Sequence, residues 1–143
     1  MISADAIADV LGGRSVLRRK VSSLSDLREI VAEGLPKQSL RHTVSTIAPA
    51  PSEASRMIFA IIPAATFKRR TRLKRPESER TERLARVIAT ARHVLETADN
   101  VKLFMLSPHQ LLKNQRPYDV AQTELGARQV EDILWDVFHG LPI

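Results

Sequence analysis

The feature that most constrains the fold is an apolar stripe of helical spacing between Pro76 and Ala98. Apolar side chains recur there every three or four residues, at Leu84, Val87, Ile88, Ala91, Val94, Leu95 and Ala98. In an α-helix this spacing places them all on one face, which needs other elements to cover it. The stripe therefore predicts one long helix, Pro76 to about Ala98. On its polar side, Glu79–Arg83 and Glu82–Arg86 form i, i+4 pairs that each contribute about 0.2–0.5 kcal/mol.

Shorter helices are expected on both sides of this long one, because capping residues and glycine or proline stops bracket short amphipathic runs. The segment Arg14–Val21 is either a short extended stretch or a loop. Signals for strands are scarce, so the fold class is all-α. The expected helices start after Ser3 and after Pro36, and otherwise cover Asp26–Glu33, Glu53–Ile62, Ala64–Arg72, part of Asp99–Gln115, Pro117–Ala121 and Glu124–Phe138.

Composition limits the kind of protein that this chain can be. A length of 143 residues suits one compact domain or two small ones. There is no cysteine, which excludes disulfides and thiolate metal sites. No apolar run approaches the roughly 18 residues of a membrane span, and the first residues carry acids rather than the bases of a signal peptide. We expect a cytoplasmic protein with no membrane partner.

A basic run in the middle of the chain indicates a nucleic-acid partner. The net charge is +6, which favours an anionic ligand. Two short helices, Glu53–Ile62 and Ala64–Arg72, meet at Pro63 in a helix-turn-helix pattern, and Phe67 would hold the second against the first. A recognition helix needs short polar or basic side chains towards the DNA. The candidate DNA-binding residues are Thr66, Lys68, Arg69, Arg70, Arg72 and Lys74.

Each basic run also has a plainer interpretation. Lys68–Arg75 would be a solvated charge run if the helix-turn-helix did not form. A second cluster of basic residues either adds phosphate contacts or is simply solvated. Its members are Arg14, Arg18, Arg19 and Lys20.

The last helix carries a tryptophan away from its core stripe. Val130, Ile133, Leu134 and Val137 form the stripe, whereas Trp135 points with Arg128 towards the polar side, near Glu124 and Glu131. Trp135 either packs under a loop of its own domain or anchors a protein interface, where tryptophan is enriched. Phe138 and the apolar end Leu141–Ile143 favour the interface.

Nothing in the sequence suggests catalysis. The four histidines, His42, His93, His109 and His139, include no metal-spaced pair, and His93 with Glu96 is interpreted as a solvated pair. There is no glycine-rich phosphate loop, GxSxG motif or cysteine nucleophile. We expect no enzyme activity, no cofactor and no metal site.

Several stretches, in order along nearly the whole chain, resemble the Xre-type antitoxins that pair with RES-domain toxins, the Xre/MbcA/ParS family. The most specific is TELGARQVEDIL, followed by HGLP. The stretches are LGG at Leu11–Gly13, VLRR at Val16–Arg19, DLREIVAEGLP at Asp26–Pro36, FKRR at Phe67–Arg70, ESERTERLARV at Glu77–Val87, TELGARQVEDIL at Thr123–Leu134 and HGLP at His139–Pro142.

The resemblance implies two parts: an Xre-like helix-turn-helix region over residues 1–75, and a long helix with a small helical toxin-binding domain over residues 76–143. It implies that the chain forms a hetero-oligomer with an NAD-consuming RES toxin and occludes that toxin. Within this complex the chain would be a homodimer. It would also bind operator DNA and so repress its own operon. The alternative is a plain repressor whose C-terminal half only dimerises. The candidate toxin-binding residues are Glu124, Arg128, Trp135, His139, Gly140, Leu141, Pro142 and Ile143. The last five either lie at the mouth of the toxin's NAD site or fold back on their own helix and close the core.

Overall fold

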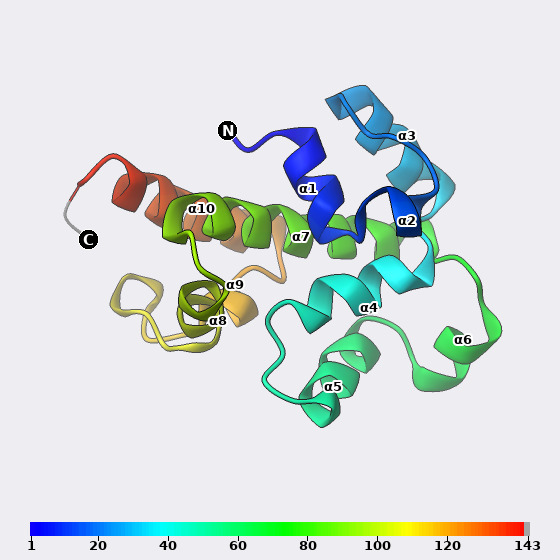
Figure 1. Cartoon of the computed structure of the whole chain (residues 1–143). Helices are drawn as coiled ribbons and strands as arrows, with labels where there is room; N and C mark the ends of the chain where they lie inside the picture. Colours follow the sequence, from blue (N-terminus) through cyan, green and yellow to red (C-terminus); the bar gives the residue numbers. More distant parts are fainter. Residues whose placement is uncertain (142–143) are drawn as a thin grey trace.

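The long helix that the apolar stripe predicts is α7, Arg75–Leu95, at the centre of the molecule (Figure 1). The structure is a computed structural model that describes residues 1–141. Pro76 lies in the first turn of α7, where a missing N–H costs nothing. The helix ends three residues before Ala98, because Glu96 has a φ of 70° and turns the chain out of the helix.

The described residues are helical and contain no strand, which confirms the all-α fold class. A helix-turn-helix domain is followed by a helical C-terminal domain. The helices other than α7 are α1 (Ala4–Val10), α2 (Gly13–Leu17), α3 (Leu24–Glu33), α4 (Lys37–Ser45), α5 (Pro51–Ile61), α6 (Ala64–Arg69), α8 (Ala98–Leu106), the short 3-10 helix η1 (Gln110–Leu112), α9 (Pro117–Val120) and α10 (Glu124–Phe138).

Two expectations for individual segments were wrong. Residues 13–17 form α2 rather than an extended segment or loop, and Leu17 is buried on its inner side. Helix α6 ends at Arg69 instead of Arg72, because Arg70 is extended and the following residues pair with the segment before α4. That pairing consists of hydrogen bonds from the Lys37 N–H to the Thr71 carbonyl and from the Leu73 N–H to the Leu35 carbonyl.

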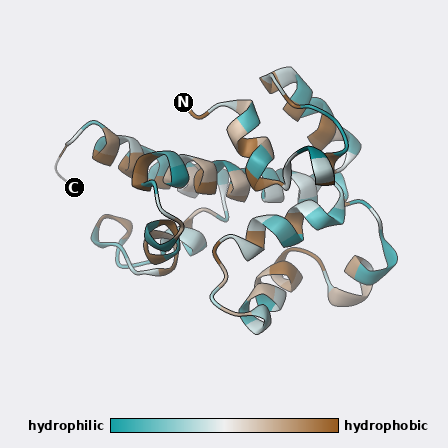
Figure 2. Ribbon diagram, in the orientation of Figure 1, coloured by the Kyte–Doolittle hydropathy of each residue, from teal (hydrophilic) through white to brown (hydrophobic). Residues whose placement is uncertain are grey.

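The other helices pack around α7 on several sides. Helices α1, α3 and α4 contact it from the N-terminal half of the chain, and α8 and α10 contact it from the C-terminal half. Figure 1 shows α10 beside α7. The two helices run in the same direction, since Arg83 contacts Glu124 near the start of α10 and His93 contacts Phe138 at its end. Hydrophobic and hydrophilic residues alternate along both helices (Figure 2).

The polar side of α7 is bound to α10. Arg83 does not pair with Glu79 as expected but donates to Glu124 at 3.2 Å, since its side chain lies towards α10 and is only 19% exposed. Glu79 pairs instead with Arg75, also at 3.2 Å. The expected Glu82–Arg86 contact is present at 3.8 Å. Across residues 1–141, no helix is both long and apolar enough to cross a membrane.

Candidate functional site

Helices α5 and α6 form the helix-turn-helix that the sequence predicts. Only Ile62 and Pro63 separate the two helices. Phe67 is buried on the inner side of α6, and its ring meets that of Phe59 edge-on with 6.2 Å between centroids. This contact confirms the expectation that Phe67 holds α6 against α5.

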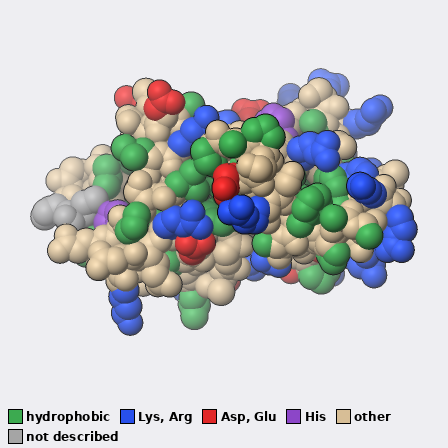
Figure 3. Space-filling model, turned by 90° about the horizontal axis from the view of Figure 1, so that it is seen from below, with side chains coloured by type: hydrophobic (Ala, Val, Ile, Leu, Met, Phe, Trp, Pro, Cys, Tyr) green, Lys and Arg blue, Asp and Glu red, His purple; other side chains and the backbone are tan. Residues whose placement is uncertain are grey.

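The outer side of α6 presents free cations. Lys68 and Arg69 are exposed, and no salt bridge joins either to a carboxylate anywhere in residues 1–141. Thr66 is half-buried beside them. In Figure 3, Lys and Arg side chains gather over the end of the molecule where α6 lies. An unpaired, exposed cation is free to meet a phosphate.

Two other cations of this run donate to groups of the protein itself. Arg70 donates to Glu77 at 2.7 Å, and Arg72 donates to the Gly34 carbonyl at 2.7 Å. Lys74 is exposed and precedes α7, with its backbone N–H bonded to the Glu77 carboxylate. Of the six candidate DNA-binding residues, Arg70 and Arg72 are therefore anchored by their side chains, whereas the side chains of Lys68, Arg69 and Lys74 are exposed and form no salt bridge within residues 1–141.

The second basic cluster lies close to this region. Arg14, Arg18, Arg19 and Lys20 are all exposed, although Arg19 pairs with Glu33 at 3.3 Å. Arg18 lines a hollow of about 360 Å³ together with Arg72. One residue of each basic cluster thus lines the same hollow, although Arg18 and Arg72 lie more than 50 positions apart in sequence.

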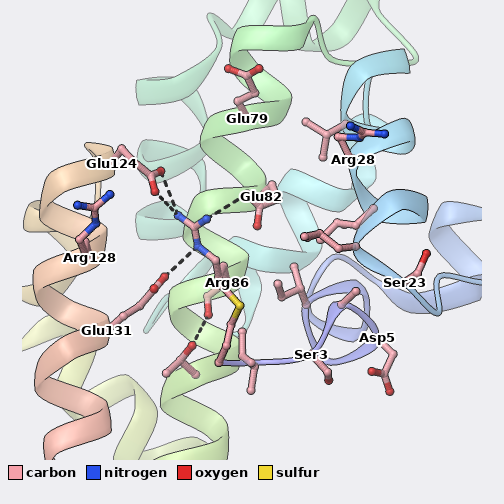
Figure 4. Close-up of a pocket in the computed structure, with 18 of the residues that line it drawn as sticks. Ser3, Asp5, Ser23, Arg28, Glu79, Glu82, Arg86, Glu124, Arg128 and Glu131 are labelled. Atoms are coloured by element: carbon pink, nitrogen blue, oxygen red, sulfur yellow. Dashed lines mark hydrogen bonds and ion pairs between the residues drawn. The ribbon is translucent and has the colours of Figure 1, made fainter.

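A groove of about 770 Å³ runs along α7, and we call it the α7 groove. Its floor includes Glu82 and Arg86 of α7, one wall comes from α1 and α3, and the other comes from α10. Figure 4 shows Glu124, Arg128 and Glu131 on the α10 side and Arg28 on the opposite side. The sequence placed Trp135 with Arg128, Glu124 and Glu131, and all four line this groove.

Arg86 gathers three carboxylates at the floor of the groove. It donates to Glu131 at 2.9 Å and to Glu124 at 3.1 Å, and lies 3.8 Å from Glu82. Burial raises the pKa values of Glu82 and Glu131, and the attraction of Arg86 only partly offsets it. Burial also acts to raise the pKa of Glu124, but hydrogen bonds and charge from Arg86 and Arg83 outweigh it and lower that pKa.

Four aromatic rings meet where α7 and α10 end. Trp135 is half-buried, and its ring centroid lies 5.6 Å from that of His93 and 5.4 Å from that of Phe138. His139 lies 5.3 Å from Phe138. We call these four residues the aromatic cluster. Its outer part is open, since Phe138 is 51% exposed, so Trp135 packs within its own domain and also borders an exposed apolar surface.

The C-terminal candidates extend beyond this cluster. Gly140 ends α10 with a φ of 71°, and the Leu141 N–H donates to the Asp136 carbonyl, which directs the chain away from the helix. Leu141 is 53% exposed. Pro142 and Ile143 lie outside the described residues. Arg128 is exposed, whereas Glu124 is engaged by Arg83 and Arg86.

Sequence reasoning missed His93, which it interpreted as a solvated partner of Glu96. The ring of His93 instead packs on Trp135 and Phe138. Only the pairing of α7 with α10 reveals this contact, because the residues lie more than 40 positions apart. Within residues 1–141, no group of three or more His, Asp or Glu side chains has an arrangement that suits a metal ion.

Two protein-family models match the chain. The model described as "Antitoxin Xre-like helix-turn-helix domain" matches residues 26–86, which include α5 and α6 with their basic side chains. The model described as "Antitoxin Xre/MbcA/ParS C-terminal toxin-binding domain" matches residues 90–140, which include α10 and the aromatic cluster. No match was found among curated proteins.

Proposed function

The chain belongs to the Xre-type antitoxins, and from this membership we propose that it neutralises a RES-domain toxin and represses its own operon. It combines a DNA-binding helix-turn-helix with a toxin-binding domain. Both matched domains are binding modules, so its role is to occupy DNA and protein surfaces rather than to catalyse. The RES class of the toxin is supported by the resemblance of sequence stretches along nearly the whole chain.

The observation that carries the toxin-binding proposal is the open aromatic cluster on α10. A tryptophan packed by rings on two sides is rigid, so little side-chain entropy is lost when a partner covers it. Phe138 and Leu141 extend the apolar surface beyond Trp135. The toxin-binding surface that we propose consists of Glu124, Arg128, Trp135 and the chain from His139 onward.

Occlusion is the mode of neutralisation that we propose. Gly140 turns the chain out of α10, and the apolar Leu141 that follows is 53% exposed. Proline at position 142 restricts the chain, which lowers the entropic cost of docking. This end would lie at the mouth of the toxin's NAD site, and the α10 surface would hold the complex together.

The test uses the full chain and a RES-domain protein encoded beside it. The two are purified together, and NAD consumption is measured for the toxin alone, for the complex, and for a complex with a chain that lacks Leu141–Ile143. We expect the complex to form in both cases and NAD consumption to return in part with the truncated chain. A truncated chain that binds and silences the toxin fully would eliminate the end of the chain as the blocking element.

Repression is tested with the DNA that precedes the operon. We expect the chain to bind this duplex, with affinity falling as salt rises because cations of α6 replace counterions on the phosphates. If the chain binds the duplex but never a RES protein, it is a plain repressor whose C-terminal half serves dimerisation. If the chain binds a RES protein but not the duplex, operon repression is wrong.

A further inference from the structure

Helix α6 is too short to hold its own orientation. It has six residues, whereas isolated helices below about 12 residues are marginal in water. Its position must therefore come from contacts with other elements. The described contacts are the packing of Phe67 and a set of hydrogen bonds from basic side chains around its C-terminal end.

Lys37 and Arg41 contact α6 from α4. The Lys37 ammonium donates to the Phe67 carbonyl at 2.8 Å and to the Lys68 carbonyl at 3.4 Å. It thereby satisfies carbonyls that the end of a helix leaves without partners. The same ammonium lies 5.0 Å from the centre of the Phe67 ring, and the Arg41 guanidinium lies 5.1 Å from it.

Arg70 connects the end of α6 to the start of α7. Its guanidinium lies 2.7 Å from the Glu77 carboxylate, and the two side chains are only 26% and 17% exposed. The same Glu77 oxygen accepts the Lys74 N–H at 2.7 Å and so caps α7. Because the pair is largely withdrawn from water, it is less screened than a surface ion pair.

We propose that Arg70, Glu77 and Lys37 are positioning residues that hold α6 in the orientation that meets DNA, whereas Lys68 and Arg69 contact the DNA itself. The proposal rests on DNA binding by the helix-turn-helix. It reassigns Arg70, the second arginine of the FKRR run, from contact with DNA to an ion pair within the protein.

Whether Glu77→Gln raises or lowers the affinity for DNA decides if the Arg70–Glu77 pair positions α6. Removal of a carboxylate near DNA strengthens binding by general electrostatics, but loss of the anchor weakens binding because fewer molecules hold α6 in place. We expect affinity for the upstream duplex to fall about fivefold, in line with a coupling of about 1 kcal/mol. Glutamine still accepts the Lys74 N–H, so the cap survives.

The control is Glu79→Gln, which removes the same charge from the same helix. Glu79 is 51% exposed, and within residues 1–141 its only salt bridge is with Arg75, so this variant should bind the duplex at least as tightly as the original chain. Equal strengthening by Glu77→Gln and Glu79→Gln would overturn the proposal.

Salt dependence tests Arg70 itself. Log affinity falls as log salt concentration rises. If Arg70 contacted a phosphate, Arg70→Gln would make this slope less steep by about 0.9. We expect that loss of slope from Arg69→Gln. In contrast, Arg70→Gln should keep the slope and weaken binding at least as much as Glu77→Gln does. The double variant should bind no more weakly than either single variant, because both remove the same interaction.

Hydrogen exchange gives a measurement without DNA. The backbone amides of residues 67–73 should exchange faster in Arg70→Gln and in Glu77→Gln than in the original chain. In Arg69→Gln their exchange rates should stay the same. Unchanged exchange in all three variants would overturn the proposal. If the original chain did not bind the upstream duplex, the proposal of operon repression would be wrong. The exchange measurement would still decide whether Arg70 positions α6.

Discussion

Gly126 is the residue whose identity the packing of the C-terminal domain constrains most. It lies in the first turn of α10, where Thr123 caps the helix by accepting the Gly126 N–H. A methyl group on Gly126 would overlap the carbonyl oxygen of Val120, the last residue of α9. The glycine of the TELGAR stretch therefore serves close approach between α9 and α10.

Replacement of this glycine tests that role, because two effects oppose each other. Alanine in a helix is favoured over glycine by about 1 kcal/mol, but forced overlap in a packed region typically costs about 1–3 kcal/mol. We expect Gly126→Ala to lower the free energy of unfolding, measured by urea denaturation. Gln129→Ala, at an exposed position of the same helix, should change it little. A Gly126→Ala chain more stable than the original would contradict the close approach.

At the scale of elements, the contact between α7 and α10 depends on charge as well as on apolar packing. Glu82 and Glu131 have raised pKa values in the folded protein because burial disfavours their charged forms. The folded state thus binds these protons more tightly than the unfolded chain. Their contribution to the free energy of unfolding is fully present below about pH 4.5, which is the ordinary pKa of glutamate. It is lost as the pH rises through the raised pKa values of the folded protein. The pKa of Glu124 is lowered instead, so its contribution to stability is present at higher pH and is lost as the pH falls through the lowered pKa.

Glu82→Gln removes one of the groups responsible. We expect the variant to gain stability relative to the original chain as pH rises from about 4.5 to 7, because glutamine has no proton to lose. Urea denaturation at both pH values measures the difference. The exposed Glu79→Gln on the same helix should show no such gain. A difference between Glu82→Gln and the original chain that stays constant or reverses with pH would show that Arg86 fully compensates the buried carboxylate.

At the scale of the whole molecule, the two proposed binding surfaces lie at opposite ends. Figure 1 places α6 at one end and the C-terminal part of α10 at the other, with α7 between them. The free cations of α6 and the aromatic cluster share no residue. A substitution in one surface should therefore leave binding at the other intact.

Trp135→Ala tests this separation. We expect it to weaken toxin binding by about 2 kcal/mol or more, as for an aromatic anchor, while affinity for the upstream duplex stays unchanged. Calorimetry with the toxin and a DNA titration measure the two effects. Leu103→Ala, which truncates an exposed leucine of α8, is the control for loss of apolar surface elsewhere in the domain. Loss of both activities with a lowered melting temperature would show that Trp135 is a core residue.

The sequence by itself determined the features that depend on near neighbours. The all-α class, the long helix α7 and the break at Pro63 follow from periodicity and from proline and capping signals within about four residues. The family also followed from short stretches in their order along the chain. Trp135 was placed correctly off the core stripe, because helical geometry alone sets the direction of each side chain.

Only the tertiary structure decided which charges and rings are free. Arg72 bonds to a carbonyl 38 residues away and Arg83 to a carboxylate 41 residues away, and His93 packs on a ring from another helix. The sequence shows the same Arg or Lys whether its side chain contacts DNA or another part of the protein. Its role depends on which backbone carbonyl or carboxylate the fold brings within hydrogen-bonding distance, and no local pattern carries that information.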